Sequence, residues 1–182
     1  MALSLRTKRL LLREWRDEDT DPFASLSADP VAMELLLGPY DRAASERWME
    51  ATRDHWRRRG FGEWVVEIPG EASFIGVIGL NYLDFPAPFS PAVEVAWRLV
   101  PAYWGKGYAR EAARAAIEDG FYRLGMDEIV AITTPANRRS WGLMERLGMS
   151  RDPAEDFDHP RVPDGHALKR HVLYRLRRPA PA

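Results

Sequence analysis

A glycine-rich turn between a strand pattern and a helix pattern constrains the fold of this chain more than any other feature. The stretch runs from Leu99 to Ala113 and reads LVPAYWGKGYAREAA. Before it, apolar residues alternate at 93, 95, 97 and 99, which is the period of a half-buried strand. After it, small and apolar residues recur every three or four positions from Ala109 to Leu124, which is the period of a helix packed along one face. A strand, a tight turn and a helix are therefore predicted in direct succession.

The turn itself has the features of an anion site. Gly105 and Gly107 let the backbone turn tightly with its amides unobstructed. Free amides and the dipole at a helix N-terminus both favour phosphate. Arg110 lies in the first helical turn, where a cation opposes the dipole unless an anion is bound, and Lys106 adds a second cation. A plain strand-to-helix turn with a surface lysine and arginine is the alternative interpretation.

These residues resemble a known motif. Residues 104 to 109 are similar to the acyl-CoA-binding motif of the GNAT N-acyltransferases, Arg/Gln-x-x-Gly-x-Gly/Ala, with Trp104 at the first position. Tryptophan there is typical of the branch that resembles the Rim-type ribosomal-protein N-terminal acetyltransferases, where Tyr-Trp-Gly-Lys-Gly-Tyr-Ala is common. A second segment, residues 137 to 149, looks like the family's Asn-x-x-Ser/Ala…Glu-Lys-x-Gly-Phe run. The resemblance extends from Leu5 to about Leu176.

The resemblance implies an α+β GNAT fold, in which a twisted, mostly antiparallel sheet has splayed central strands and helices on both faces. It also implies acetyl-CoA as co-substrate. The candidate cofactor-binding residues are Leu99, Val100, Trp104, Gly105, Lys106, Gly107, Tyr108, Ala109, Arg110, Asn137 and Arg139.

The periodicity of the chain supplies the other elements. The first half is predicted to hold a strand over Leu3–Trp15, a short helix capped by Asp17 or Asp19, a helical piece over Val31–Leu37, and a longer helix over Asp41–Arg59. The second half is predicted to hold strands at 64–68, 75–80 and 93–100, the central helix, a strand at 128–133, a helix at 138–147 and a last strand at 171–176. A mixed sheet covered by helices on both faces follows from this order.

Composition limits the remaining possibilities. With 182 residues, a single domain over 1–178 with a frayed tail at 179–182 is expected. The absence of cysteine excludes disulfides, cysteine zinc sites and a cysteine acyl-enzyme. A net charge of −1 gives no field that recruits nucleic acid or an anionic membrane. His159 and His166 lack the spacing of metal ligands, so no metal is expected. The start of the sequence lacks the apolar core of a signal peptide, and a cytoplasmic location is expected.

The chemistry expected is direct transfer of an acetyl group to a primary amine in a ternary complex. Glu94 is the candidate general base, because it points away from the apolar face of its strand and matches the acidic residue of the Rim-type branch. A solvated or salt-bridged strand residue is the alternative. Asn137 resembles the family asparagine near the pantetheine arm, or is a helix N-cap. Many family members have a tyrosine acid where this chain has Met144, which leaves Ser140 or a water as proton donor.

The acceptor is expected to be a protein N-terminal α-amine or a small-molecule amine, received between segments 31–40, 84–91 and 151–168. The sequence leaves open whether the protein forms a homodimer. A non-catalytic acyl-CoA-binding regulatory or scaffold domain is the alternative function. A nucleotide-binding protein is disfavoured because Gly107 follows Lys106, where a Walker motif requires serine or threonine.

Overall fold

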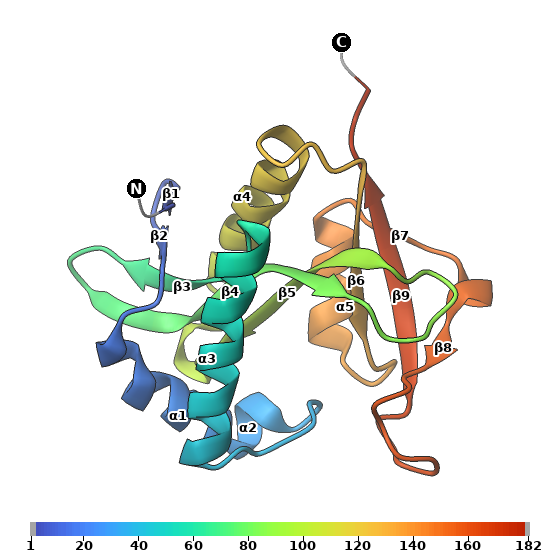
Figure 1. Ribbon diagram of the computed structural model, residues 1–182, viewed down its shortest axis with the longest axis horizontal. Helices are drawn as coiled ribbons and strands as arrows, with labels where there is room; N and C mark the ends of the chain where they lie inside the picture. Colours follow the sequence, from blue (N-terminus) through green and yellow to red (C-terminus); the bar gives the residue numbers. More distant parts are fainter. Residues whose placement is uncertain (1–2, 181–182) are drawn as a thin grey trace.

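The computed structural model describes residues 3–180, in which nine strands form one sheet (Figure 1). Its strand order is β1-β2-β3-β4-β5-β6-β9-β7, and β8 pairs with β9. The strands are β1 (Leu5–Arg6), β2 (Leu11–Arg13), β3 (Glu63–Ile68), β4 (Ala72–Leu83), β5 (Ala92–Leu99), β6 (Glu128–Thr133), β7 (Ser150–Arg151), β8 (Phe157–Asp158) and β9 (Arg170–Arg177). The helices are α1 (Thr20–Ala28), α2 (Pro30–Met33), α3 (Arg42–Arg59), α4 (Tyr108–Tyr122) and α5 (Arg138–Arg146).

The sheet is antiparallel except between β5 and β6, which run parallel. These two strands share a single register pair, Glu94 opposite Val130, whereas β4 and β5 are paired continuously from Gly76–Leu99 to Leu83–Ala92. The centre of the sheet is therefore splayed, because β5 and β6 diverge on either side of one contact. The predicted fold class, with its mostly antiparallel sheet and splayed central strands, is confirmed.

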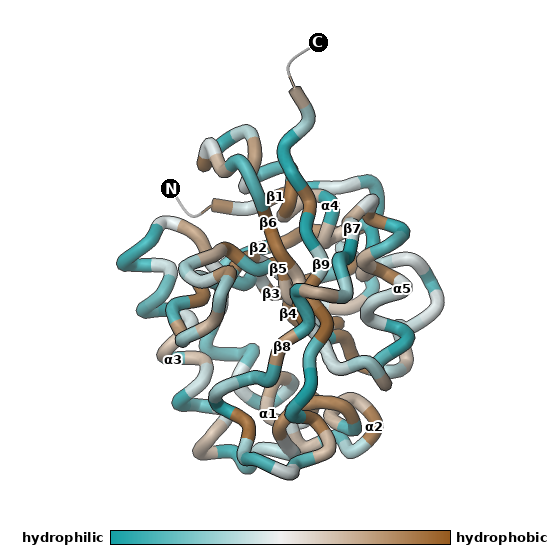
Figure 2. The backbone as a smooth tube through the Cα atoms, turned by 90° about the vertical axis from the view of Figure 1, so that its right-hand side faces the viewer, coloured by the Kyte–Doolittle hydropathy of each residue, from teal (hydrophilic) through white to brown (hydrophobic). Residues whose placement is uncertain are grey.

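Helices cover both faces of the sheet. The largest apolar cluster joins the buried residues of α4 and α5, such as Ala116 and Leu143, to the sheet face that carries Trp64 and Ile78. A smaller cluster packs α1 and α3 on the opposite face, around Phe23. Figure 2 shows hydrophobic residues along the central strands, as expected for strands enclosed between two helical layers.

The first segment differs from its prediction. A single strand was expected over Leu3–Trp15, but the chain forms the hairpin β1–β2, with Leu5 opposite Leu12. The Thr7 amide donates to the Leu10 carbonyl at 2.9 Å, and the Leu10 amide donates to the Thr7 hydroxyl at 3.0 Å. The threonine side chain thus satisfies an amide that a continuous strand would have given to a neighbour, and the chain reverses.

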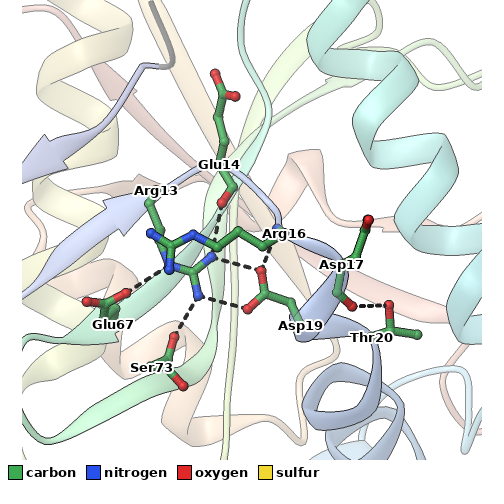
Figure 3. A network of polar contacts seen from close by, with 8 residues as sticks. All are labelled: Arg13, Glu14, Arg16, Asp17, Asp19, Thr20, Glu67 and Ser73. Carbon is green, nitrogen blue, oxygen red and sulfur yellow. Dashed lines mark hydrogen bonds and ion pairs between the residues drawn. The ribbon is translucent and has the colours of Figure 1, made fainter.

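A buried arginine fixes the end of this hairpin (Figure 3). Arg13 is 5% exposed and donates to both carboxylate oxygens of Asp19 at 2.8 Å, to Glu67 at 2.9 Å and to the Ser73 carbonyl at 2.8 Å. Asp19, one of two predicted caps, does occupy the N-cap position of α1, but its side chain accepts from Arg13 and from the Arg16 amide instead of an α1 amide. The network connects β2 to β3, to β4 and to the turn before α1.

Most other elements lie where they were predicted. Helix α3 is capped by Asp41, which accepts from the Ala44 amide at 2.7 Å, and it ends at Gly60 in the left-handed region. Helix α2 stops at Met33, four residues earlier than predicted, so residues 34–40 form an irregular segment. Two short strands that were not predicted, β7 and β8, lie between α5 and β9. The two last residues of the predicted tail lie outside the described residues.

No helix within residues 3–180 is long and apolar enough to cross a membrane.

Candidate functional site

A cleft of about 1040 Å³ opens where β5 diverges from β6, between α4, α5 and the irregular segment 34–36. Nine of the eleven predicted cofactor residues line it: Leu99, Trp104, Gly105, Gly107, Tyr108, Ala109, Arg110, Asn137 and Arg139. Val100 and Lys106 are not part of this lining. The splayed strands thus produce the cavity, and the glycine-rich turn forms one end of it.

The turn presents backbone amides to the cleft. Gly105 and Gly107 have φ values of 74° and 82°, in the left-handed region that favours glycine. The first bond within α4 runs from the Glu111 amide to the Gly107 carbonyl at 3.1 Å. The amides of residues 108–110 therefore have no partner in the helix and are available to an anion. Arg110 is exposed at the same end and forms no ion pair with any residue from 3 to 180.

The first hairpin braces this turn, and this contact was not predicted from the sequence. Arg9 donates from Nε to Glu111 at 2.7 Å and from Nη1 to the Lys106 carbonyl at 3.0 Å, and its guanidinium lies 4.5 Å from the centroid of the Tyr108 ring. Thr7 donates to the same Glu111 carboxylate at 2.7 Å. These contacts, together with the amide of Arg9, hold the pKa of Glu111 below its usual range despite partial burial. Residues 7 and 9 could not be linked to position 111 from spacing alone.

Trp104 has a structural reason to occupy the first motif position. Its indole N–H donates to the Leu99 carbonyl at 2.8 Å, which fixes the end of β5 beside the turn. The Arg139 guanidinium lies 4.7 Å from the centroid of the same ring. The tryptophan therefore positions a cation from α5 at the cleft.

The start of α5 lines the opposite wall. The Asn137 carbonyl Oδ1 accepts from the Ser140 amide at 3.2 Å, so Asn137 is a helix N-cap and also a cleft residue. Ser140 and Met144 line the cleft as well, and Met144 is buried, with 1% exposed. The thioether of Met144 has no proton to donate. Among these three side chains, Ser140 alone has a hydroxyl that can reach the cleft.

A second cavity, of about 370 Å³, adjoins the first on the α1–α3 face of β5. Both cavities are lined by Leu35, Leu36, Glu94, Ala96, Trp97, Arg98, Ile132 and Thr133. Segments 31–40 and 151–168 contribute to the smaller cavity through residues such as Tyr40 and His159. The 84–91 loop, which was expected to border an acceptor site, lines neither cavity. Its Phe89 packs instead on Phe157, with ring centroids 4.8 Å apart.

Glu94 lies in the wall shared by the two cavities. Burial and, to a smaller extent, the nearby Glu63 charge raise the pKa of Glu94 to about 8, against the opposing effect of a hydrogen bond from the Ile132 amide. A carboxylate whose pKa lies this close to neutrality can both accept and release a proton under ordinary conditions.

Three further polar residues share the face of the sheet that carries Glu94. Asn81 lies directly opposite Glu94 in the β4–β5 register and donates to Glu63 at 2.6 Å. Glu63 is 5% exposed, and burial raises its pKa. Arg98 follows Glu94 by four residues on the same strand face. Sequence reasoning missed these residues. The sequence did hold a signal for them, because these polar residues interrupt strands that are otherwise mainly apolar.

The family model for the acetyltransferase (GNAT) domain matches residues 9–150. The chain is 27% identical over 195 residues to the FsC-acetyl coenzyme A-N(2)-transacetylase of Aspergillus fumigatus, with 97% of this chain and 80% of that protein covered. An acetyltransferase structure from Agrobacterium tumefaciens superposes with a TM-score of 0.78 at 28% identity, covering 97% of this chain and 95% of that one.

The fold is also that of a Rim-type enzyme. The structure of RimL, a ribosomal L7/L12 α-N-protein acetyltransferase, superposes with a TM-score of 0.79 over 97% of this chain and 95% of that one. Its identity to this chain is 14%, so the likeness concerns the fold.

Proposed function

The chain belongs to the GNAT acetyltransferase family and is an acetyl-CoA-dependent N-acetyltransferase, and from this premise we propose that it acetylates an α-amine by direct transfer in a ternary complex. One observation carries the proposal: the Glu94 carboxyl lies where the cleft beside the glycine-rich turn meets a second, smaller cavity. Acetyl-CoA fits the first cavity and the amine fits the second, so that the two reactants meet at Glu94.

The cofactor would be held at its phosphates by the turn. The amides of residues 108–110, the α4 dipole and Arg110 all favour an anion at this end of the cleft. Arg139, which lies over Trp104, adds a cation on the α5 side. The pantetheine arm would then pass between the splayed strands β5 and β6 toward Glu94.

The transfer needs one proton removed from the amine. Glu94 accepts that proton as the amine nitrogen attacks the thioester carbonyl, and a tetrahedral intermediate forms. The C–S bond then breaks, the acetyl group remains on nitrogen, and CoA leaves. An ordinary thiol has a pKa of about 8.5, so the sulfur can leave as a thiolate with little help. A thiolate that leaves with little help is consistent with Met144, which has no proton to donate, at the position of the family's tyrosine. Ser140 or a water remains as the proton donor.

The acceptor class follows from proton affinities. An α-amine has an ordinary pKa of about 7.7–8.0, against about 10.4 for a lysine side chain. Glu94, with a pKa of about 8, matches the α-amine and is far too weak a base for a lysine ammonium. The name of the Aspergillus relative, an N(2)-transacetylase, is in keeping with acetylation at nitrogen.

A competition experiment tests the proposal. A peptide with a free N-terminus and no lysine is mixed with the same peptide that is N-terminally blocked and carries one lysine, and acetylated products are measured by mass spectrometry. A small α-amine is tested beside them. Faster acetylation of the α-amines is expected because more of them are neutral at pH 7. Faster acetylation of the lysine would overturn the proposed acceptor class.

A further inference from the structure

Arg98 is a half-buried cation without a close ionic partner among residues 3–180. Its Nη1 makes two long contacts, to the Ser27 hydroxyl at 3.4 Å and to the Met33 sulfur at 3.5 Å. Its guanidinium lies 5.1 Å and 5.2 Å from the ring centroids of Phe23 and Trp48. Arg98 takes part in no ion pair within residues 3–180, in contrast to Arg13, which is surrounded by carboxylates. Five N–H donors in one rigid plane are thus largely unused.

The guanidinium belongs to the wall of the smaller cavity. Arg98, Met33 and Trp48 all line it, and Glu94 lies in the same wall, four residues earlier on β5. Their Cα atoms are about 13 Å apart along the strand, a separation that the long arginine side chain can shorten, and both residues line one chamber, the smaller cavity. A ligand with a nitrogen near Glu94 could therefore place a second group near Arg98.

The charges around the chamber leave Arg98 uncompensated. Burial lowers the pKa of Arg98, and the Glu63 charge opposes this shift, but Glu63 accepts its hydrogen bond from Asn81 and forms no ion pair with Arg98. Burial lowers the pKa of His171, and burial together with the His171 ring lowers that of His159 to about 4, so neither imidazole adds charge at neutral pH. Burial also raises the pKa of Glu94 and that of Glu63, so the negative charge that these carboxyls offer to Arg98 is reduced.

We propose that Arg98 binds a carboxylate on the acceptor, and that the acceptor is an amino acid, held with its carboxylate at Arg98 and its amine toward Glu94. This inference rests on the proposed function and narrows it from α-amines in general. A planar guanidinium pairs with a carboxylate through two parallel hydrogen bonds, which a lysine or an amide cannot reproduce. The chamber volume of about 370 Å³ suits a molecule of this size, and the Arg98 cation in its wall opposes a polyamine.

Pairs of substrates test the inference on the unaltered protein. Each amino acid is compared with its α-carboxamide by CoA release at saturating acetyl-CoA. The carboxylate-bearing member is expected to have a kcat/KM about 10- to 100-fold higher, which corresponds to the loss of hydrogen bonds to a charged group. Equal rates within each pair, or faster acetylation of the amide, would overturn the inference.

The variants Arg98→Met and Arg98→Lys then assign the effect to this side chain. Arg98→Met is expected to remove the preference for the carboxylate, measured as the ratio of kcat/KM within each substrate pair. Arg98→Lys is expected to keep part of the preference because the charge is kept. The rest is expected to be lost, because lysine cannot form the two parallel hydrogen bonds. An Arg98→Met enzyme with an unchanged preference would overturn the assignment. If Arg98→Met does not fold, the Arg98→Lys variant and the substrate pairs still decide.

Binding separates failure of this inference from failure of the proposed function. Calorimetric titration of glycine and glutamate into the protein saturated with CoA is expected to show binding that Arg98→Met abolishes. If these ligands bind in this way but no amine is acetylated, the anion site stands and the acetyl-transfer proposal fails. If α-amines are acetylated but carboxylates give no binding and no preference, the proposed function stands and the role of Arg98 fails.

Discussion

Arg9 donates from Nε to the Glu111 carboxylate at 2.7 Å and thereby joins the first hairpin of the sheet to the first turn of α4. The same guanidinium contacts the Lys106 carbonyl, so both sides of the glycine-rich turn are attached to one side chain. An exposed ion pair by itself adds little stability. We expect this ion pair to fix the geometry of the glycine-rich turn instead of adding much stability.

The first prediction concerns this brace. Glu111→Gln is expected to weaken CoA binding several-fold, because Arg9 would lose the charge that holds it against the turn. Calorimetric titration with CoA measures the effect. Glu118→Gln is the matched control, since Glu118 is an exposed glutamate farther along α4 and outside the cleft. Equal CoA affinity in Glu111→Gln and the unaltered protein would show that the brace does not shape the site.

Gly107→Val is expected to abolish measurable CoA binding. The residue has a φ of 82°, and a side chain there would narrow the approach of a pyrophosphate to the α4 amides. Gly70→Val is the control for backbone strain, because Gly70 has a φ of 79°, has open space around it and lies in the β3–β4 hairpin. The two variants are compared by thermal unfolding and by CoA titration. Loss of CoA binding in both would indicate general destabilisation instead of a blocked site.

Arg110→Glu is expected to weaken CoA binding strongly at low salt and less at high salt, since ionic screening reduces the contact with phosphate. Arg114→Glu makes the same charge change on an exposed position of α4 that does not line the cleft. Titrations at about 20 mM and 500 mM salt measure both variants. An Arg110→Glu effect that matches that of Arg114→Glu would place Arg110 outside the phosphate site.

Glu94→Gln is expected to lower kcat by about 100-fold or more while CoA affinity is kept, because the amine then loses its general base. In the unaltered enzyme, kcat/KM is expected to rise with pH through the pKa of Glu94, about 8. Glu63→Gln removes a charge that raises the pKa of Glu94, so it is expected to shift this limb to lower pH. A pH profile identical in all three proteins would show that Glu94 is structural.

The same group makes a stability prediction with a definite sign. The folded-state pKa of Glu94 is raised, so its contribution to stability is fully present below about pH 4.5 and is lost as pH rises through about 8. Glutamine does not titrate, so the Tm of Glu94→Gln relative to the unaltered protein is expected to increase from pH 5 to pH 8.5, by several degrees. Thermal unfolding followed at both pH values measures this, and a constant Tm difference would contradict it.

Arg13→Met is expected to destabilise the fold by about 3–5 kcal/mol, because Asp19 would remain buried without its cation. Arg42→Met is the control, since Arg42 also pairs with two carboxylates but its side chain is 61% exposed. Denaturant unfolding gives the free energy for both variants. Similar values for the two would show that burial does not set the strength of the Arg13 network.

Local signals accounted for most of the elements. The alternation at 93–99 predicted β5, and Asp41 and Gly60 marked the ends of α3, because periodicity and capping depend on neighbours within a few residues. Prediction failed where the local sequence was compatible with two conformations. Thr7 could continue a strand or close a turn, and its hydrogen bonds with Leu10 selected the turn.

The sequence by itself determined the strand, turn and helix around Gly107, and it excluded a cysteine intermediate. It also indicated Glu94 as a polar residue on an apolar strand. Tertiary structure alone decided that Arg98, Asn81 and Glu63 share a chamber with Glu94, and that Arg9 braces the turn 97 residues later. The physical reason is strand register. Pairing across a sheet brings together residues that are distant in the chain, and it depends on the packing of every strand and not on the pattern within any one of them.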